Sequence, residues 1–274
     1  MTTALVVERV DDGADVRLDP YRSLTDMDLR RRIEPEGGYF MAEGHLVIAR
    51  AAALGLRIES VLTAEKWLDR LAVDLAGWSG PVYVADDELL REITGYRVHR
   101  GALAMVRRPA THSLADVTAT CGPLLILEDL VDHTNVGLAF RSAAALGIAG
   151  VVLSPGCADP LYRRAVRTSM GAVLELPWAR AEAWPADLRA LQRRIVALTP
   201  DPAAPALDQA LSAGEATPMA LLVGSEGPGL SASAREAASS LARIPMDAGI
   251  DSLNVAAAIA VACYALRMQG ARHG

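Results

Sequence analysis

Residues 220–229 read Ala-Leu-Leu-Val-Gly-Ser-Glu-Gly-Pro-Gly. The four apolar residues that open this stretch predict a buried strand, because strands of a parallel sheet are covered on both faces. The glycines that follow let the backbone approach a ligand closely, and Pro228 stiffens the turn. A glycine-rich turn alone is weak evidence for a site. Glu226 strengthens that evidence, because a carboxylate between glycines has little structural role and therefore favours a functional one.

Two other polar turns accompany this one. Residues 128–141 contain Asn135, which can cap a helix, and Arg141, which lies among apolar residues where a charge normally needs a partner or a ligand. Residues 251–255 read Asp-Ser-Leu-Asn-Val ahead of a small-residue helix, and a cap explains Ser252 or Asn254 but hardly both. Open α/β sheets bind ligands at such turns, so the three predict one composite site. The glycine-rich turn at residues 224–229 lacks the order of a dinucleotide fingerprint, of a P-loop and of a hydrolase elbow.

Strand and helix patterns alternate in the second half of the chain. This alternation predicts an α/β fold, with a mostly parallel sheet that carries helices on both faces. A smaller α/β unit precedes it, and residues 109–119 read as a boundary. The predicted domains are residues 1–108, a linker at 109–121, and residues 122–274. The predicted strands of the second domain include 124–127, 151–154, 173–176, 195–199, 220–224 and 242–245, and its predicted helices include 136–146, 161–170, 186–193, 232–239 and 254–267.

Composition narrows the function classes. Hydrophobic residues make up 51% of the chain and charged residues 22%, as in a globular protein. No apolar stretch is long enough to span a bilayer and the first residues lack a signal-peptide pattern, so we expect a cytoplasmic protein. A net charge of -6 argues against coating nucleic acid by charge alone, but it allows a local basic face. The three cysteines, Cys121, Cys157 and Cys263, lack metal-ligand spacing and predict buried thiols without a metal.

Taken in order, the three turns carry a family resemblance. Asn135-x-Gly-x-x-x-Arg141, residues 222–231 and the segment from Ile244-Pro245-Met246 through residues 252–255 resemble the three motifs of the SpoU (TrmH) class of RNA ribose methyltransferases. The matched core spans residues 122–269. Residues 20–106, with Glu43-Gly44 and the glycines of residues 94–104, are similar to the substrate-binding domain that often precedes this core. That domain has the fold of the ribosomal proteins L30 and L7Ae.

The resemblance implies methyl transfer from S-adenosylmethionine to a ribose 2'-hydroxyl of RNA. It also implies a homodimer through the catalytic domain and a C-terminal trefoil knot, which the residue pattern alone does not suggest. The extra N-terminal domain favours rRNA (23S) over tRNA, and no metal is expected. By carry-over, the catalytic residues are Arg141, Asn135, Glu226 and Asn254, and the cofactor contacts are Gly224, Ile244, Leu253, Ser252 and Thr199. Ala256 departs from the pattern, since many relatives have Ser there.

Arginines supply the candidate RNA contacts, since Lys66 is the only lysine. A plain solvated helix face is the competing interpretation for both helical clusters. The candidates are Arg30, Arg31, Arg32, Arg97 and Arg100 in the first domain, and Arg163, Arg164 and Arg167 in the second. Two alternatives stay open: an RNA-binding protein of this fold that has lost its chemistry, and a different nucleotide-binding enzyme such as a dehydrogenase. Resistance to a ribosome-targeting antibiotic through rRNA methylation is a narrower possibility within the favoured class.

Overall fold

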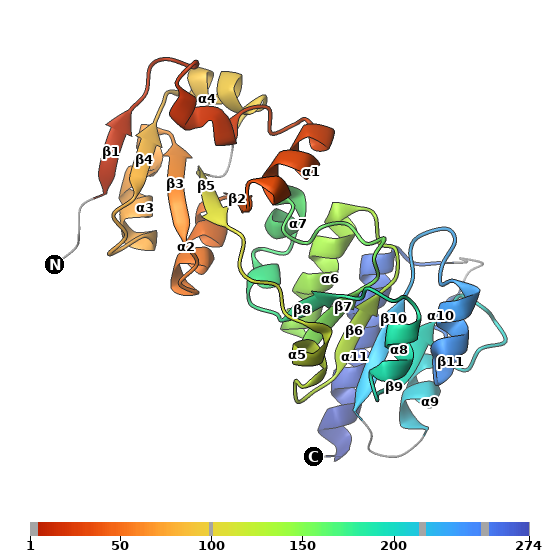
Figure 1. Cartoon of the computed structure of the whole chain (residues 1–274). Coiled ribbons are helices and arrows are strands. Elements are labelled where there is room, and N and C mark those ends of the chain that lie inside the picture. Colours follow the sequence, from red (N-terminus) through yellow and green to blue (C-terminus); the bar gives the residue numbers. More distant parts are fainter. Residues whose placement is uncertain (1–4, 99–100, 214–217, 248–251, 274) are drawn as a thin grey trace. The chain divides into compact units, whose positions relative to one another are not determined.

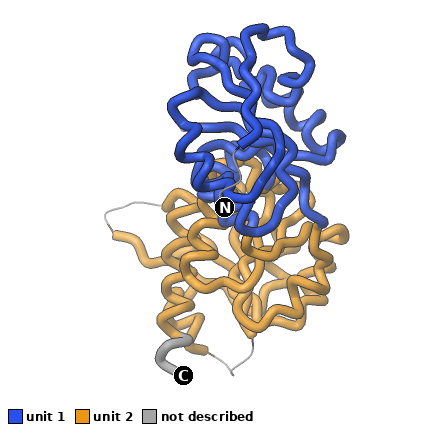
Figure 2. Tube along the Cα trace, turned by 90° about the vertical axis from the view of Figure 1, so that its left-hand side faces the viewer, with its two compact units in different colours: residues 1–110, 161–174 blue, residues 111–160, 175–274 orange. Residues whose placement is uncertain are grey.

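The chain folds into two compact units. The computed structural model describes residues 5–98, 101–213, 218–247 and 252–273. Unit 1 comprises residues 1–110 and 161–174, and unit 2 comprises residues 111–160 and 175–274 (Figure 2). Residues 161–174, which the sequence pattern placed in the second domain, therefore belong by their contacts to unit 1. The assignment of a function to each predicted domain stays a prediction.

Unit 1 is built on a five-stranded mixed sheet in the order β1-β4-β3-β5-β2 (Figure 1). Strands β1, β4 and β3 pair in parallel, whereas β5 runs antiparallel to both β3 and β2. Its strands are β1 (Val6–Arg9), β2 (Tyr39–Glu43), β3 (Ile58–Thr63), β4 (Pro81–Val84) and β5 (Ala102–Arg107). All five residues of β2 are buried, because helices cover this edge of the sheet.

The helices of unit 1 include one that comes from the second half of the sequence. Both α1 and this helix, α7, pack on β2. The α-helices are α1 (Met27–Glu36), α2 (His45–Ala53), α3 (Leu68–Asp74), α4 (Asp87–Thr94) and α7 (Arg163–Thr168). The 3-10 helices are η1 (Val16–Tyr21), η2 (Glu65–Trp67) and η3 (Ala172–Leu174). The strand predicted at 173–176 is wrong, because Leu174 donates to the carbonyl of Gly171 and closes a helical turn there.

Unit 2 has the parallel sheet that the sequence predicts. Its order is β11-β9-β10-β6-β7-β8, and every neighbouring pair is parallel. The strands are β6 (Leu124–Leu127), β7 (Gly150–Leu153), β8 (Trp178–Arg180), β9 (Arg194–Leu198), β10 (Met219–Val223) and β11 (Ser240–Ala242). From β6 the chain builds outward through β7 and β8, and later strands fill the other side. The strand order therefore reverses beside β6, where ligands bind in such sheets. The predicted strand at 242–245 instead ends at Ala242.

Helices cover both faces of this sheet (Figure 1). One core cluster joins Leu124, Ile126, Ala220 and Leu222 of the strands to α5, α8 and α10. Since side chains alternate along a strand, Leu125 and Leu221 point to the other face, where α6 and α11 pack on each other. The helices are α5 (Leu114–Thr118), α6 (His133–Ala145), α8 (Ala186–Ala190), α9 (Leu207–Ser212), α10 (Ala232–Ala237) and α11 (Val255–His273).

Candidate active site

A cavity of about 370 Å³ opens in unit 2 where β9 and β10 end. All five predicted cofactor contacts line it, namely Gly224, Ile244, Leu253, Ser252 and Thr199. Glu226 and Asn254 line it as well. Met246, Val255 and Ala258 add apolar wall and were not among the predicted cofactor contacts. The cavity thus combines apolar surface with a few polar groups, as small-molecule sites do.

The turn after β10 depends on the absence of a side chain at Gly224. A Cβ atom there would lie 2.4 Å from the carbonyl carbon of Gly229 and 2.5 Å from the backbone nitrogen of Leu230. The turn closes on itself, since the Gly229 N–H donates to the Ser225 carbonyl at 3.1 Å. Gly224 therefore lets the two ends of the turn meet and leaves backbone facing the cavity.

Asn254 joins the three polar turns. Its amide nitrogen donates to Glu226 Oε1 at 2.6 Å and to Asn135 Oδ1 at 3.3 Å. Its amide oxygen accepts from the backbone N–H of Ala256 at 3.0 Å, which caps the first turn of α11. Asn254 is therefore the cap, and Ser252 is left as an exposed residue of the cavity wall. Ala256 is buried, and this cap uses its backbone rather than its side chain.

Asn135 reaches this cluster because another residue caps its helix. The N-cap of α6 is Asp132, whose carboxylate accepts from the backbone N–H groups of Thr134 at 2.7 Å and Asn135 at 3.0 Å. The capping role considered for Asn135 is therefore wrong. Asp132 lies three positions before Asn135, where the motif begins, and an acid just before an apolar helix was the signal that could have identified it.

Arg141 does not join this cluster. It lies six residues after Asn135 on α6, about 9 Å farther along the helix axis. Its side chain is exposed and does not line the cavity. Among the residues that the structure describes, it makes no hydrogen bond or ion pair. Its guanidinium is thus free to meet a group from outside the described chain.

Glu128 anchors the glycine-rich turn, although it is not among the predicted site residues. It follows β6 directly and is 2% exposed. Its carboxylate accepts from Ser231 N at 2.8 Å, Ser231 Oγ at 2.7 Å and Trp184 Nε1 at 2.7 Å. Ser231 also caps α10 by accepting from Ala234 N at 3.1 Å. A charged residue at the end of an apolar strand was the available signal.

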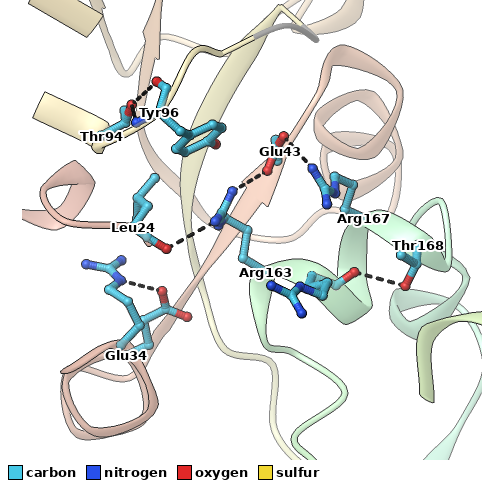
Figure 3. Close-up of polar contacts among 10 residues, drawn as sticks. Leu24, Glu34, Glu43, Thr94, Tyr96, Arg163, Arg167 and Thr168 are labelled. Atoms are coloured by element: carbon cyan, nitrogen blue, oxygen red, sulfur yellow. Dashed lines mark hydrogen bonds and ion pairs between the residues drawn. The ribbon is translucent and has the colours of Figure 1, made fainter. Parts of the chain in front are cut away.

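Three of the predicted RNA contacts instead form ion pairs with carboxylates inside unit 1. The prediction is corrected for these three arginines. Arg30 is 1% exposed and donates to Glu34 at 2.8 Å. Arg163 and Arg167 both donate to Glu43, at 2.5 Å and 3.2 Å (Figure 3). Among the other candidates, Arg31, Arg32, Arg97 and Arg164 are exposed, and Arg100 lies outside the described residues.

Neither a metal site nor a membrane span is found in the described ranges. They contain no group of three or more His, Cys, Asp or Glu side chains that could hold a metal. No helix there is long and apolar enough to cross a bilayer.

Comparison with known proteins identifies the family. The model of the SpoU rRNA Methylase family matches residues 122–264, which is more than half of the chain. The chain belongs to this family. It is therefore an RNA methyltransferase, and the SpoU match covers β6 to most of α11, including the whole cavity.

Relatives of this SpoU methylase extend over both units. An uncharacterized tRNA/rRNA methyltransferase of Mycobacterium tuberculosis is 42% identical over 263 residues, covering 95% of this chain and 91% of that protein. The 23S rRNA (guanosine-2'-O-)-methyltransferase RlmB of Yersinia pestis is 30% identical over 207 residues, covering 73% and 83%. The crystal structure of an AdoMet-bound rRNA methyltransferase from Sinorhizobium meliloti has a TM-score of 0.78 at 25% identity, covering 96% and 98%.

Proposed function

We propose that this SpoU methylase transfers a methyl group from S-adenosylmethionine to a ribose 2'-hydroxyl of rRNA, with 23S rRNA favoured over tRNA. The observation that carries the proposal is the cavity at the ends of β9 and β10, with Glu226 and Asn254 in its wall. The names of the Yersinia and Sinorhizobium relatives support the target and the cofactor. The relative from Mycobacterium tuberculosis, which is named for both RNA classes, leaves tRNA as the competing target.

The cavity suits the cofactor in size and in chemistry. Its volume of about 370 Å³ lies within the range of roughly 300–1,000 Å³ found for small-molecule sites. The backbone at Gly224 can receive polar groups, and Ile244 and Leu253 supply apolar surface for a base. Thr199 and Ser252 add hydroxyls that can donate or accept. When bound, S-adenosylmethionine supplies a methyl group that its sulfonium charge has already activated.

The protein's task is to orient the ribose hydroxyl and to stabilise the charge that develops on it. Glu226 and Asn135 fix the Asn254 amide, so Asn254 can present a rigid group to the cofactor side of the site. Arg141 supplies a positive charge and several N–H donors in a planar fork. Its role in this proposal is to grip the adjacent phosphate and to lower the cost of negative charge on the oxygen.

Arg141→Lys tests this role, because it keeps the charge but removes the two-pronged donor. We expect turnover to fall while S-adenosylmethionine binding is unchanged. Near wild-type turnover would contradict a geometric clamp. A turnover profile that follows the pKa of the substituted side chain would favour Arg141 as the base.

A homodimer and a knot belong to the same proposal. The exposed apolar residues Val261, Tyr264 and Met268 are spaced three and four apart on α11, which suits a helix face covered by a second copy. Tyr264→Arg would then shift the protein toward monomer in sedimentation experiments, and an unchanged mass would exclude this face. The trefoil knot stays a prediction, because the path from β11 to α11 passes through residues 248–251, outside the described ranges.

The decisive experiment maps ribose methylation in total RNA from cells with and without the protein. We expect one 2'-O-methylated nucleotide of 23S rRNA to disappear on deletion and to return with the wild-type gene. Methylation of a base with the ribose untouched would overturn the proposed reaction. Calorimetry that shows RNA binding without S-adenosylmethionine binding would identify the protein as the inactive alternative.

A further inference from the structure

Two helices that are distant in sequence pack on the same strand of unit 1. Both α1 and α7 pack on β2, although more than a hundred residues separate them along the chain. Together they carry six arginines, at positions 30, 31, 32, 163, 164 and 167. Such a concentration of positive charge needs either internal counter-charges or an external anion.

Two buried carboxylates neutralise three of these arginines. Glu34 and Arg30 form an ion pair in which each side chain is 1% exposed. Glu43 is 3% exposed and accepts from both Arg163 and Arg167 (Figure 3). The arginines of such pairs cannot turn to an external anion, because the buried carboxylate would then lose its counter-charge.

Arg163 makes further contacts within unit 1. Besides Glu43, it donates to the Leu24 carbonyl at 3.0 Å, and its guanidinium lies 4.6 Å from the centre of the Tyr96 ring. These contacts join α7 to β2, to the segment before α1 and to the segment after α4. They fix the position of α7, and hence the direction in which its remaining arginine projects.

Arg31 on α1 and Arg164 on α7 are both exposed. Neither makes a hydrogen bond or an ion pair with any residue in the described part of the chain. Tyr162, the N-cap residue of α7, directly precedes Arg163 and Arg164. Burial raises the pKa of Tyr162, and the positive charges of Arg163, Arg164 and Arg31 oppose that rise. Arginines of both helices thus act on the same hydroxyl.

We propose that Arg31 and Arg164 form a two-helix clamp for one stretch of RNA backbone. This proposal rests on the proposed function. It assigns RNA binding to two of the arginines that the sequence gives as candidate RNA contacts. Each guanidinium presents several donors in a rigid fork that fits phosphate oxygens. Glu34 and Glu43 are its positioning residues, because they hold α1 and α7 in place without drawing on the two free arginines.

The test compares Arg31→Gln, Arg164→Gln and the double variant with Arg91→Gln as a matched control. Arg91 is also an exposed arginine of unit 1 whose side chain is unpaired among the described residues, but it lies on α4 and is not a candidate RNA contact. The probe is a 23S rRNA transcript, with its Kd measured from low to high KCl. Binding of S-adenosylmethionine is measured in parallel by calorimetry.

We expect each single clamp variant to weaken RNA binding about tenfold. The double variant should lower the slope of log K against log salt by roughly 1.4 to 1.8, which corresponds to two lost phosphate contacts. Arg91→Gln and cofactor binding should match wild type. If the double variant keeps the wild-type Kd and slope, or if Arg91→Gln loses as much, the clamp is wrong while RNA binding stands. A wild-type protein that binds S-adenosylmethionine but no RNA would overturn the proposed function itself.

Discussion

Glu43→Gln removes the negative charge that Arg163 and Arg167 share, and we expect it to destabilise unit 1 by about 3 kcal/mol. The substitution keeps the size of the side chain and one acceptor oxygen. It places an NH₂ group where the second arginine now donates. The Arg163 charge then remains 15% exposed, against the Tyr96 ring, with no anion to balance it.

The magnitude follows from the burial of the pair. Removing one partner of a buried ion pair costs about 3–5 kcal/mol, because the remaining charge stays out of water. The lower end applies here, since Arg167 is 36% exposed and can turn toward solvent. For a unit of this size, about 3 kcal/mol lowers the melting temperature by roughly 10 °C.

The measurement is differential scanning calorimetry of the full chain, together with hydrogen exchange of β2 and β5 amides followed by mass spectrometry. Exchange localises the loss of stability to unit 1, whereas S-adenosylmethionine binding by unit 2 should be unchanged. Glu43→Leu combined with Arg163→Met should recover much of the loss, because an apolar pair of similar volume needs no counter-charge.

Glu59→Gln is the matched control for this experiment. Glu59 also accepts from two arginines of unit 1, Arg57 and Arg107, but those side chains are 76% and 45% exposed. We expect a cost of less than about 1 kcal/mol there. Equal losses for Glu43→Gln and Glu59→Gln would refute the reasoning, because burial would then not decide what the charge contributes.

Three further predictions concern unit 2. Gly224→Ala should weaken S-adenosylmethionine binding more than about tenfold in calorimetry. The added Cβ would lie 2.4 Å from the carbonyl carbon of Gly229 and would force the turn open. Unchanged affinity would show that the turn does not shape the cavity. Asn254→Ala should lower the free energy of unfolding by about 1–2 kcal/mol, because α11 loses its cap. It should also raise the KM for the cofactor, because the hydrogen bond to Glu226 is lost. A KM equal to wild type would show that Asn254 acts only as the helix cap. Burial raises the pKa of the Cys263 thiol to about 12. Iodoacetamide at pH 8 should therefore modify the exposed Cys121 and should leave Cys263 unmodified until the protein is denatured. Rapid labelling of Cys263 in the native protein would contradict its burial.

Local patterns in the sequence were enough for the fold class of unit 2. Apolar runs such as residues 124–127 and 220–223 predict strands because both faces of a parallel strand are buried. The polar turns at the strand ends predicted one composite site at an edge of the sheet. The family resemblance named five of the residues that line the cavity. Short apolar runs were less reliable, and residues 172–174 form a helical turn where the pattern favoured a strand.

The partners of charged side chains could not be read from the chain. Arg30, Arg31 and Arg32 are equivalent as a run of letters, yet Arg30 is buried against Glu34 while its two neighbours face solvent. A helix turns by about 100° per residue, so adjacent residues meet different environments. Which of the three faces inward depends on the surface that α1 covers.

By itself, the sequence determined the alternation of strands and helices, the three polar turns and the family, because each rests on residues that are close together along the chain. Only the tertiary structure decided that Asn254 hydrogen-bonds Glu226 and Asn135, that Glu128 anchors the turn at Ser231, and that α7 belongs to unit 1. Asn254 and Asn135 are 119 residues apart, and Arg163 and Glu43 are 120 apart. Such pairs form because packing brings distant segments of the chain together. A local sequence pattern contains no information about which distant segments come into contact.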